Sequence, residues 1–306
     1  MLYSIGALGA VHRSHGRADS VAGMPTLLDA AGGGQIALHE LAGDGEPGIV
    51  VVHATSFNAA ALAPLARRME GKRVVGLDLR GHGAASRGDA ATFEWRSIGD
   101  DVLAALDWLE AHLPGPLHGF GHSAGGTALL LAAAARPERF ARLYCYEPIA
   151  LTDAQRAEEK LPGAFAGAAR RRARFDSTLD ALAYLGKRPP LSGLDPEVLT
   201  AYVEGGLREH PGGGVELACA PEFEAAVYRA GYEADVTAEL AAVHCPVTVA
   251  FGGDSRGIGV AGSSLVASTV ANGDLLRLER LGHLGPLDDP GAVAASVITV
   301  FETPES

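Results

Sequence analysis

The chain has 306 residues, of which 47% are hydrophobic and 20% are charged, proportions typical of a globular protein. Its net charge of −12 argues against nucleic acid or an anionic membrane as the main partner. No apolar run reaches the roughly 18 residues that a membrane span requires. Cys145, Cys219 and Cys245 lack metal-ligand spacing, so we expect reduced core cysteines in a cytoplasmic protein.

Residues 1–24 form the first segment that differs from the rest of the chain. The segment is apolar at its start, but it lacks a leading positive region and a clean cleavage site, so it does not resemble a secretory signal. We therefore expect residues 1–24 to be a leader outside the folded domain, with Met24 as an alternative natural start.

Strand and helix patterns alternate over the first half of the chain. Residues 25–46 predict a strand hairpin with a turn at Gly32-Gly33-Gly34. The strands expected next cover residues 48–53, 73–78, 115–120 and 141–146, and the expected helices cover residues 59–70, 95–113 and 127–135. Such alternation predicts a parallel sheet with helices on both faces.

The alternation stops between residues 151 and 235. Charged helical segments follow one another there, and no convincing strand is seen. The expected strands at 246–251 and 275–278 and a last helix at 291–301 resume the earlier pattern. We therefore expect an α/β core made of residues 25–150 and 236–306, with a helical cap inserted at residues 151–235.

The segment Gly121-His122-Ser123-Ala124-Gly125 has the form Gly-x-Ser-x-Gly and lies between an apolar strand pattern and an Ala/Leu-rich helix pattern. A strand–turn–helix of this kind holds the serine in a strained conformation, and a side chain at either flanking glycine would clash. The helix N-terminus then aims free N–H groups at a reacting carbonyl. Ser123 is therefore the expected nucleophile, and the alternative is a glycine-rich turn before a core helix.

A second match to the same pattern occurs at Gly253-Asp254-Ser255-Arg256-Gly257. The residues that follow it, 258–262, do not predict a helix start. Too few acids separate Ser255 from the last histidine for a serine–acid–histidine order. We therefore expect Ser255 not to be the nucleophile.

A serine nucleophile needs a histidine base and a carboxylate that orients the base. His283 follows the last expected strand and has glycines on both sides, so it is the expected base. Asp254 follows the strand at 246–251 and is the expected acid. Glu147 follows the strand at 141–146 and is the rival acid, with a structural or pocket role as its first interpretation.

The oxyanion formed by such a serine needs two N–H donors. We expect these donors from Ala124, directly after the nucleophile, and from Thr55, in the loop after the strand at 48–53. Phe57 and His53, at the two ends of that loop, are expected in the substrate pocket. We expect no metal ion and no organic cofactor.

Taken together and in this order, five motifs resemble the α/β-hydrolase fold superfamily, in its cap-bearing serine hydrolase group. The motifs are His53-Ala54-Thr55, Asp78-Leu79-Arg80-Gly81-His82-Gly83, Gly121-His122-Ser123-Ala124-Gly125-Gly126, Gly252-Gly253-Asp254 and Gly282-His283. The resemblance covers the chain from about residue 25 and implies a mostly parallel, eight-stranded sheet. It also implies that the turn at 78–83 braces the active-site loops. The chain departs from the family pattern at Ala54, where a glycine is usual.

The expected function is therefore hydrolysis of a small-molecule carboxylic ester through an acyl-serine. Lactonase, thioesterase and C–C bond hydrolase activities use the same triad and stay open, as does a non-hydrolytic ligand-binding or lyase member of the fold. The run Arg170-Arg171-Arg172 in the cap is consistent with an anionic substrate or with a solvated helix face. The oligomeric state is left open.

Overall fold

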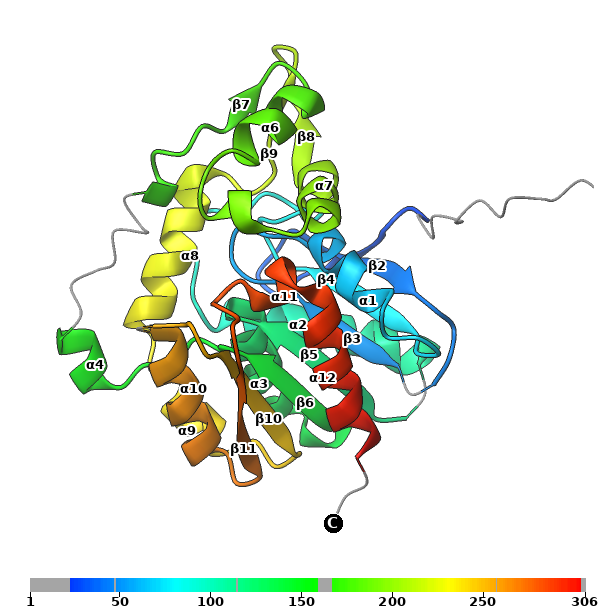
Figure 1. The fold of residues 1–306 in the computed structure, drawn as a ribbon, viewed down its shortest axis with the longest axis vertical. Coiled ribbons are helices and arrows are strands. Elements are labelled where there is room, and N and C mark those ends of the chain that lie inside the picture. Colours follow the sequence, from blue (N-terminus) through cyan, green and yellow to red (C-terminus); the bar gives the residue numbers. More distant parts are fainter. Residues whose placement is uncertain (1–22, 47, 114, 159–166, 257, 304–306) are drawn as a thin grey trace, which may run out of the picture.

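The computed structural model describes residues 23–46, 48–113, 115–158, 167–256 and 258–303, and its centre is an eight-stranded sheet (Figure 1). The strands are β1 (Thr26–Asp29), β2 (Gln35–Ala42), β3 (Ile49–Val52), β4 (Val74–Asp78), β5 (Leu117–His122), β6 (Phe140–Tyr146), β10 (Val247–Gly252) and β11 (Gly273–Leu278). Their spatial order is β1-β2-β4-β3-β5-β6-β10-β11, and only β2 runs antiparallel to its neighbours. The predicted hairpin and mostly parallel eight-stranded sheet are confirmed. Nearly all of the expected leader lies outside the described residues.

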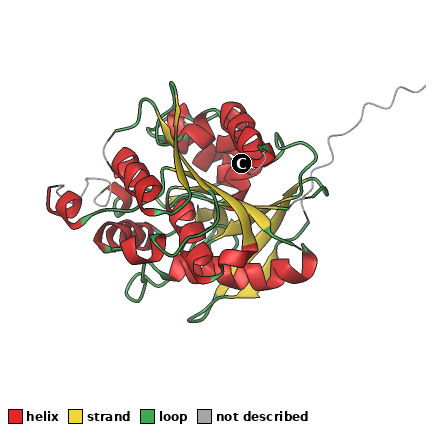
Figure 2. Ribbon diagram, turned by 90° about the horizontal axis from the view of Figure 1, so that it is seen from below, coloured by secondary structure: helices red, strands yellow, loops and turns green. Residues whose placement is uncertain are grey.

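Both faces of the sheet are covered by helices (Figure 2). Alternate side chains of β3 enter two separate apolar clusters, Val50 and Val52 on one face and Ile49 and Val51 on the other. The first cluster includes residues of α2 (Ser97–His112), α3 (Ala124–Ala135), α9 (Thr237–Leu240) and α10 (Ile258–Thr269). The second includes residues of α1 (Ala63–Ala66) and α12 (Pro290–Glu302). Burial on both faces explains why the central strands are almost continuously apolar.

The helix expected at residues 59–70 is shorter and irregular in the structure. The 3-10 turn η1 (Ala59–Leu62) comes first, with Asn58 Oδ1 accepting a hydrogen bond from the Ala61 N–H at 3.0 Å. Only the single turn of α1 follows, and Pro64 lies in its first turn. Proline has no N–H to donate, which separates the two short segments.

The chain between β6 and β10 is not purely helical, so that part of the prediction is wrong. The elements here are α4 (Asp153–Glu158), β7 (Arg174–Phe175), α6 (Thr178–Leu185), η3 (Leu191–Gly193), α7 (Pro196–Gly205), β8 (Leu207–Glu209), β9 (Val215–Leu217) and α8 (Pro221–Glu233). Strands β7, β9 and β8 form a second, antiparallel sheet at one end of the molecule (Figure 1). Each has only two or three residues, which is too short to show a period of two in the sequence.

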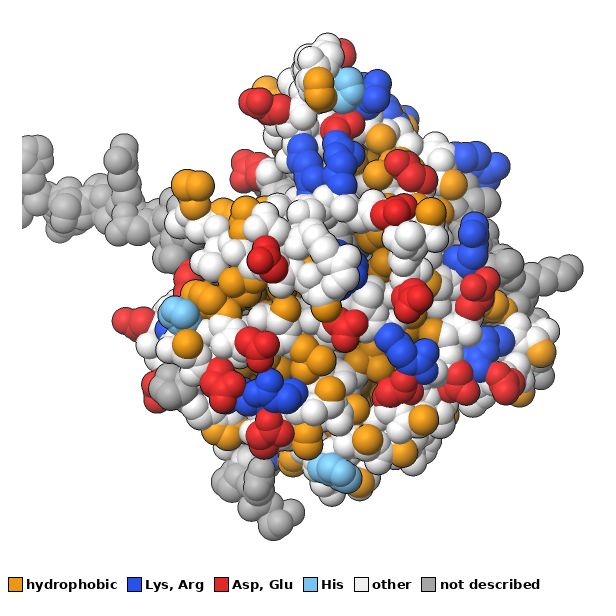
Figure 3. Space-filling view, turned by 180° about the vertical axis from the view of Figure 1, so that it is seen from behind, with side chains coloured by type: hydrophobic (Ala, Val, Ile, Leu, Met, Phe, Trp, Pro, Cys, Tyr) orange, Lys and Arg blue, Asp and Glu red, His pale blue; other side chains and the backbone are white. Residues whose placement is uncertain are grey.

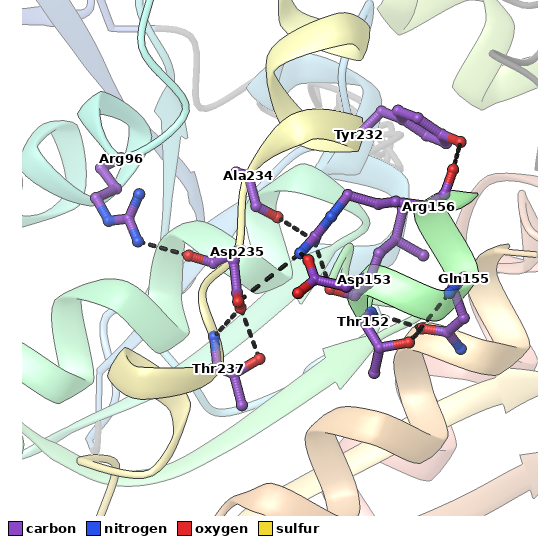
Figure 4. Close-up of polar contacts among 10 residues, drawn as sticks. Arg96, Thr152, Asp153, Gln155, Arg156, Tyr232, Ala234, Asp235 and Thr237 are labelled. Carbon is purple, nitrogen blue, oxygen red and sulfur yellow. Dashed lines mark hydrogen bonds and ion pairs between the residues drawn. The ribbon is translucent and has the colours of Figure 1, made fainter.

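The two points where this segment leaves and rejoins the core lie side by side (Figure 4). Arg156 in α4 donates to the Leu151 carbonyl at 2.6 Å and to the Ala234 carbonyl at 3.0 Å. Tyr232 at the end of α8 returns a hydrogen bond to the Arg156 carbonyl at 2.6 Å. Arg96, just before α2, donates to the Asp235 carbonyl at 2.5 Å. These contacts fasten both connections of the segment to one another and to the core.

Cys145, Cys219 and Cys245 are buried free thiols, as predicted. Among the helices of the described ranges, none is long and apolar enough to cross a lipid bilayer.

Candidate functional site

Ser123 lies in a tight turn at the carboxyl end of β5, directly before the first residue of α3. Its φ of 54° and ψ of −119° place it in a region that residues with a side chain rarely adopt. The turn is held because the Ser123 N–H donates to the Tyr146 carbonyl at 2.8 Å, while the Ser123 carbonyl accepts from the Gly126 N–H at 3.0 Å. The strand–turn–helix predicted around this serine is therefore confirmed.

The glycines on either side of Ser123 are required by close backbone contacts. A Cβ on Gly121 would lie 2.5 Å from the Gly125 carbonyl oxygen, and a Cβ on Gly125 would lie 2.2 Å from the Val52 carbonyl oxygen. Real Cβ atoms do not approach backbone oxygens so closely. Any side chain at these two positions would therefore push the helix away from the strand that supports it.

Glu147 is the carboxylate that contacts the predicted base. Its Oε2 lies 2.7 Å from His283 Nδ1, and its side chain is 1% exposed, whereas that of His283 is 43% exposed. The second oxygen, Oε1, accepts a hydrogen bond from the Gly252 N–H at 2.9 Å and another from the Ser255 hydroxyl. Burial alone would raise the pKa of Glu147, but the hydrogen bond and charge of His283, together with the other two donors, lower it.

The prediction that Asp254 is the acid is wrong, because the carboxylate that contacts His283 belongs to Glu147. Asp254 follows β10 as expected, but its side chain is exposed, and within the described residues it makes neither a hydrogen bond nor an ion pair. Only its backbone N–H is engaged, with the Leu281 carbonyl at 2.9 Å. Glu147 instead has a φ of 46°, at the end of the neighbouring strand β6. With this left-handed φ, the Glu147 carboxylate is buried and contacts Nδ1 of His283.

The loop that carries His283 is attached to the two central strands. His122 Nε2 donates to the His283 carbonyl at 2.7 Å, and the Tyr146 hydroxyl donates to the Gly282 carbonyl at 2.8 Å. Burial, aided by the nearby charge of His283, lowers the pKa of His122 to about 3, so this ring is neutral at pH 7. Because His122 precedes Ser123, the contact brings the His283 loop beside the serine. Within the described residues the Ser123 hydroxyl itself makes no hydrogen bond.

The backbone N–H groups of Thr55 and Ala124, near Ser123, have no acceptor within the described residues. Ala124 is the first residue of α3, where N–H groups lack intrahelical partners. In the loop after β3, the N–H groups of Ser56 and Phe57 are engaged, by His82 Nε2 at 3.1 Å and by the Ala54 carbonyl at 3.1 Å. Both predicted oxyanion donors therefore have an N–H group available to a ligand.

The turn after β4 braces this loop, as the family resemblance implied. Asp78 accepts hydrogen bonds from the Ala59 N–H at 2.7 Å and the Ala84 N–H at 2.8 Å, and it contacts His39 at 2.7 Å. His82, in the same turn, accepts the Ser56 N–H described above. Burial lowers the pKa of His82 to about 3, which keeps Nε2 free to accept that bond.

His53 is not a pocket residue, which corrects the prediction. Its side chain is completely buried. Nδ1 donates to the Ala54 carbonyl at 2.8 Å, and Nε2 accepts from the Leu79 N–H at 3.2 Å. With both ring nitrogens engaged in backbone contacts, His53 ties the end of β3 to the end of β4.

A cavity of about 450 Å³ lies between the loop after β3 and the segment that joins β6 to β10. Phe57 lines it, and its role in a substrate pocket stays a prediction. The other lining residues are Ser56, Gly167, Ala168, Arg170, Arg171, Arg172, Tyr184, Leu185, Arg188, Pro189, Pro190, Leu191, Tyr202, Glu224 and Tyr228.

A buried polar network on the wall of this cavity was not predicted. The Ser56 hydroxyl donates to Glu224, whose other oxygen lies 2.7 Å from Arg171 Nη1, and Arg171 Nη2 donates to the Tyr202 hydroxyl at 2.8 Å. Burial would lower the pKa of Arg171, but Tyr202 and Glu224 raise it, so the guanidinium stays charged. Ser56, which starts this network, lies in the left-handed region with a φ of 76°. The only signal for the network in the sequence was the run Arg170-Arg171-Arg172, which is equally typical of a solvated helix face.

Comparisons with known proteins agree with the fold of the chain. A sequence profile described as the alpha/beta hydrolase fold matches residues 45–290. Among curated proteins, none matches the chain in sequence.

Solved structures resemble the chain in fold at low sequence identity. An E-2-(acetamidomethylene)succinate hydrolase is 19% identical, with a TM-score of 0.76 over 92% of this chain and 99% of its own. The thioesterase domain from the curacin biosynthetic pathway is 21% identical, with a TM-score of 0.67 over 90% and 98%. A thermophilic esterase from Thermogutta terrifontis is 19% identical, with a TM-score of 0.65 over 91% and 98%.

Proposed function

This chain belongs to the alpha/beta hydrolase family, and we propose that it is a serine hydrolase with Ser123, His283 and Glu147 as its catalytic triad. The observation that carries the proposal is the 2.7 Å contact between His283 Nδ1 and the buried Glu147, beside a serine in a strained turn. The chain order serine–acid–histidine is the one found in this fold.

In the proposed reaction, Ser123 Oγ attacks the carbonyl carbon of the substrate while His283 Nε2 takes its proton. Glu147 holds the Nδ1–H tautomer of His283 and stabilises the imidazolium that forms. Its low pKa suits this role, because the carboxylate then stays charged at neutral pH. Ser123 and His283 share no hydrogen bond within the described residues, and such catalytic contacts commonly form only in the substrate complex.

The N–H groups of Thr55 and Ala124 receive the negative charge that develops on the carbonyl oxygen. The leaving group departs with the proton held by His283, and an acyl-serine remains. Water, activated by the same histidine, then releases the acid. Each residue in this scheme has the donor or acceptor that its step needs.

We propose a small-molecule carboxylic ester as the substrate class. Thioester, lactone and activated C–C substrates pass through the same oxyanion and enter as arms of the test. The structural relatives named above include an esterase, a thioesterase and a hydrolase of a succinate derivative, which is consistent with one scaffold serving several carbonyl substrates. We also propose that residues 151–235 act as the cap, because they supply most of the cavity wall.

Labelling with a fluorophosphonate probe tests the proposal. We expect one adduct at Ser123 in the wild type, unchanged labelling in Ser255→Ala, and none in Ser123→Ala. A panel of p-nitrophenyl esters of increasing acyl length, with a thioester, a lactone and an activated C–C substrate, then ranks the substrate classes. Folded wild-type protein that takes up no probe and cleaves no member of the panel would contradict the proposal and favour a ligand-binding role.

A further inference from the structure

The cavity beside the loop after β3 has an unusual charge for this protein. The chain carries 37 acidic and 25 basic residues, yet the cavity is lined by Arg170, Arg171, Arg172 and Arg188 against the single carboxylate of Glu224. Seen from behind, Lys and Arg side chains gather over the end of the molecule that holds the smaller sheet (Figure 3). An excess of positive charge in a concave site attracts anions.

Two of these arginines are already neutralised by carboxylates. Arg171 pairs with the buried Glu224, and Arg172 pairs with Asp180 at 2.6 Å. Arg172 also lies over the ring of Phe175 at 4.6 Å. These two guanidinium groups therefore stabilise the fold and leave little uncompensated positive charge in the cavity.

Arg170 and Arg188 keep their charge available. Within the described residues neither has a carboxylate partner, and both side chains are exposed. The Arg188 guanidinium lies 3.5 Å from the centre of the Tyr184 ring, and its Nη1 donates to the Tyr184 carbonyl at 2.9 Å. This fixes the side chain while its Nε and Nη2 stay free, and a guanidinium edge of this kind matches a carboxylate.

The position of the cavity connects these charges to the proposed reaction. Ser56 and Phe57 line it, and they directly follow Thr55, the proposed oxyanion donor. Neighbouring Cα atoms are about 3.8 Å apart, so one wall of the cavity is formed by the residues directly after the proposed oxyanion donor. A volume of about 450 Å³ is within the range of small-molecule sites.

We propose that this cavity is a subsite for a carboxylate at the far end of the acyl chain, held by Arg170 and Arg188. The inference rests on the proposed function and deepens it, because it makes the preferred substrate a monoester of a dicarboxylic acid. A carboxylate between two arginines that no acid of the described residues neutralises gains charge-assisted hydrogen bonds, whereas a neutral acyl chain gains none.

The test uses two esters with the same leaving group and acyl length, mono-p-nitrophenyl adipate and p-nitrophenyl hexanoate. We expect Arg170→Gln and Arg188→Gln each to lower kcat/KM for the adipate ester by roughly tenfold, mainly through KM, and the double variant by roughly a hundredfold. The rate with the hexanoate ester should stay within about twofold, which also shows that the variants fold. Arg188→Lys should recover part of the loss, because it keeps the charge and loses the fork.

Arg136→Gln is the matched control, because Arg136 caps the far end of α3 and pairs there with Asp107, Glu110 and Glu138. It removes the same charge and should change neither ester. Raising the salt concentration should raise KM for the adipate ester in the wild type and not in the double variant.

Two results would overturn the inference while leaving the proposed function intact. One is an equal loss on both esters, and the other is no loss on either ester, each with Ser123 still labelled by the fluorophosphonate. Absence of both labelling and ester cleavage in the wild type would instead show that the proposed function has failed.

Discussion

The two Gly-x-Ser-x-Gly segments of this chain both follow a strand of the large sheet, yet they form different structures. In the first segment Ser123 directly follows β5, and α3 begins at the next residue. The second was expected not to precede a helix, and that expectation is wrong, because α10 begins at Ile258. This helix begins three residues after Ser255, and Ser255 has no positive φ.

The role of each serine follows from that difference in spacing. Ser123 is held in a strained turn, and within the described residues its hydroxyl makes no hydrogen bond that would keep it from a substrate or a base. Ser255 instead donates its hydroxyl to Glu147, and so supports the carboxylate behind His283. The same five-residue pattern thus supplies the proposed nucleophile in one place and a second contact for the acid in the other. The distance from serine to helix, rather than the motif, distinguishes them.

Replacing the serine of the first segment should have the largest effect. Ser123→Ala removes the nucleophile, and we expect kcat on a p-nitrophenyl ester to fall by at least about 10⁴-fold. Burst kinetics and mass spectrometry of the acyl-enzyme measure this directly. Activity retained within tenfold would place the chemistry elsewhere.

The acids near the two segments give the second comparison. Glu147→Gln leaves His283 without a charged partner, and we expect kcat to fall on the order of 10²–10⁴-fold. Asp254→Asn is its matched control and should stay within about twofold, because the exposed Asp254 contacts no described side chain. The reverse ranking in steady-state kinetics would restore Asp254 as the acid.

Glycines of the two segments should differ in their effect on stability. Gly125→Ala forces a Cβ against the Val52 backbone, and we expect a loss of about 1–3 kcal/mol in the free energy of unfolding. A Cβ on Gly253 would meet only the ends of the Glu279 and Arg277 side chains, which can move. Gly253→Ala should therefore change stability by less than about 0.5 kcal/mol in urea denaturation. Equal losses would show that the first turn is not specially constrained.

The buried His122, directly before Ser123, should make the free energy of unfolding depend on pH. His122 is buried with a pKa of about 3, whereas an unfolded histidine titrates near 6.5. Below about pH 6.5 the unfolded His122 therefore binds a proton that the folded one does not, and this residue contributes a loss of stability of about 1.4 kcal/mol per pH unit toward pH 3. His122→Gln should remove this contribution from the pH dependence measured by urea denaturation between pH 6 and 5, while that of the other buried histidines, such as His82, remains. A slope equal to that of the wild type would mean that His122 is protonated in the fold.

The smallest effect is expected at the second serine. Ser255→Ala removes one hydrogen bond from Glu147 but leaves the contacts with His283 and the Gly252 N–H. We expect kcat/KM to fall by roughly threefold to tenfold, with fluorophosphonate labelling of Ser123 retained. A loss as large as that of Ser123→Ala would contradict the supporting role.

Much of the core was predictable because its signals are local. Apolar runs, glycine turns and a Gly-x-Ser-x-Gly segment before a helix identified the large sheet, the strained serine and the histidine loop. The short strands β7, β8 and β9 were not predictable, since two or three residues carry no period. The contact between Arg171 and Glu224 joins residues that are 53 positions apart, and neither signals the other in the sequence.

The sequence by itself determined which residues are able to do the chemistry: a serine between glycines, a histidine in a glycine loop, and one acid after each of two strands. Only the tertiary structure decided between those acids. The ends of β6 and β10 are neighbours in the sheet, so both acids reach the same edge, and the choice depends on which carboxylate turns inward. Glu147 does so through a left-handed φ and three hydrogen bonds, while Asp254 stays in solvent, and no local pattern encodes that difference.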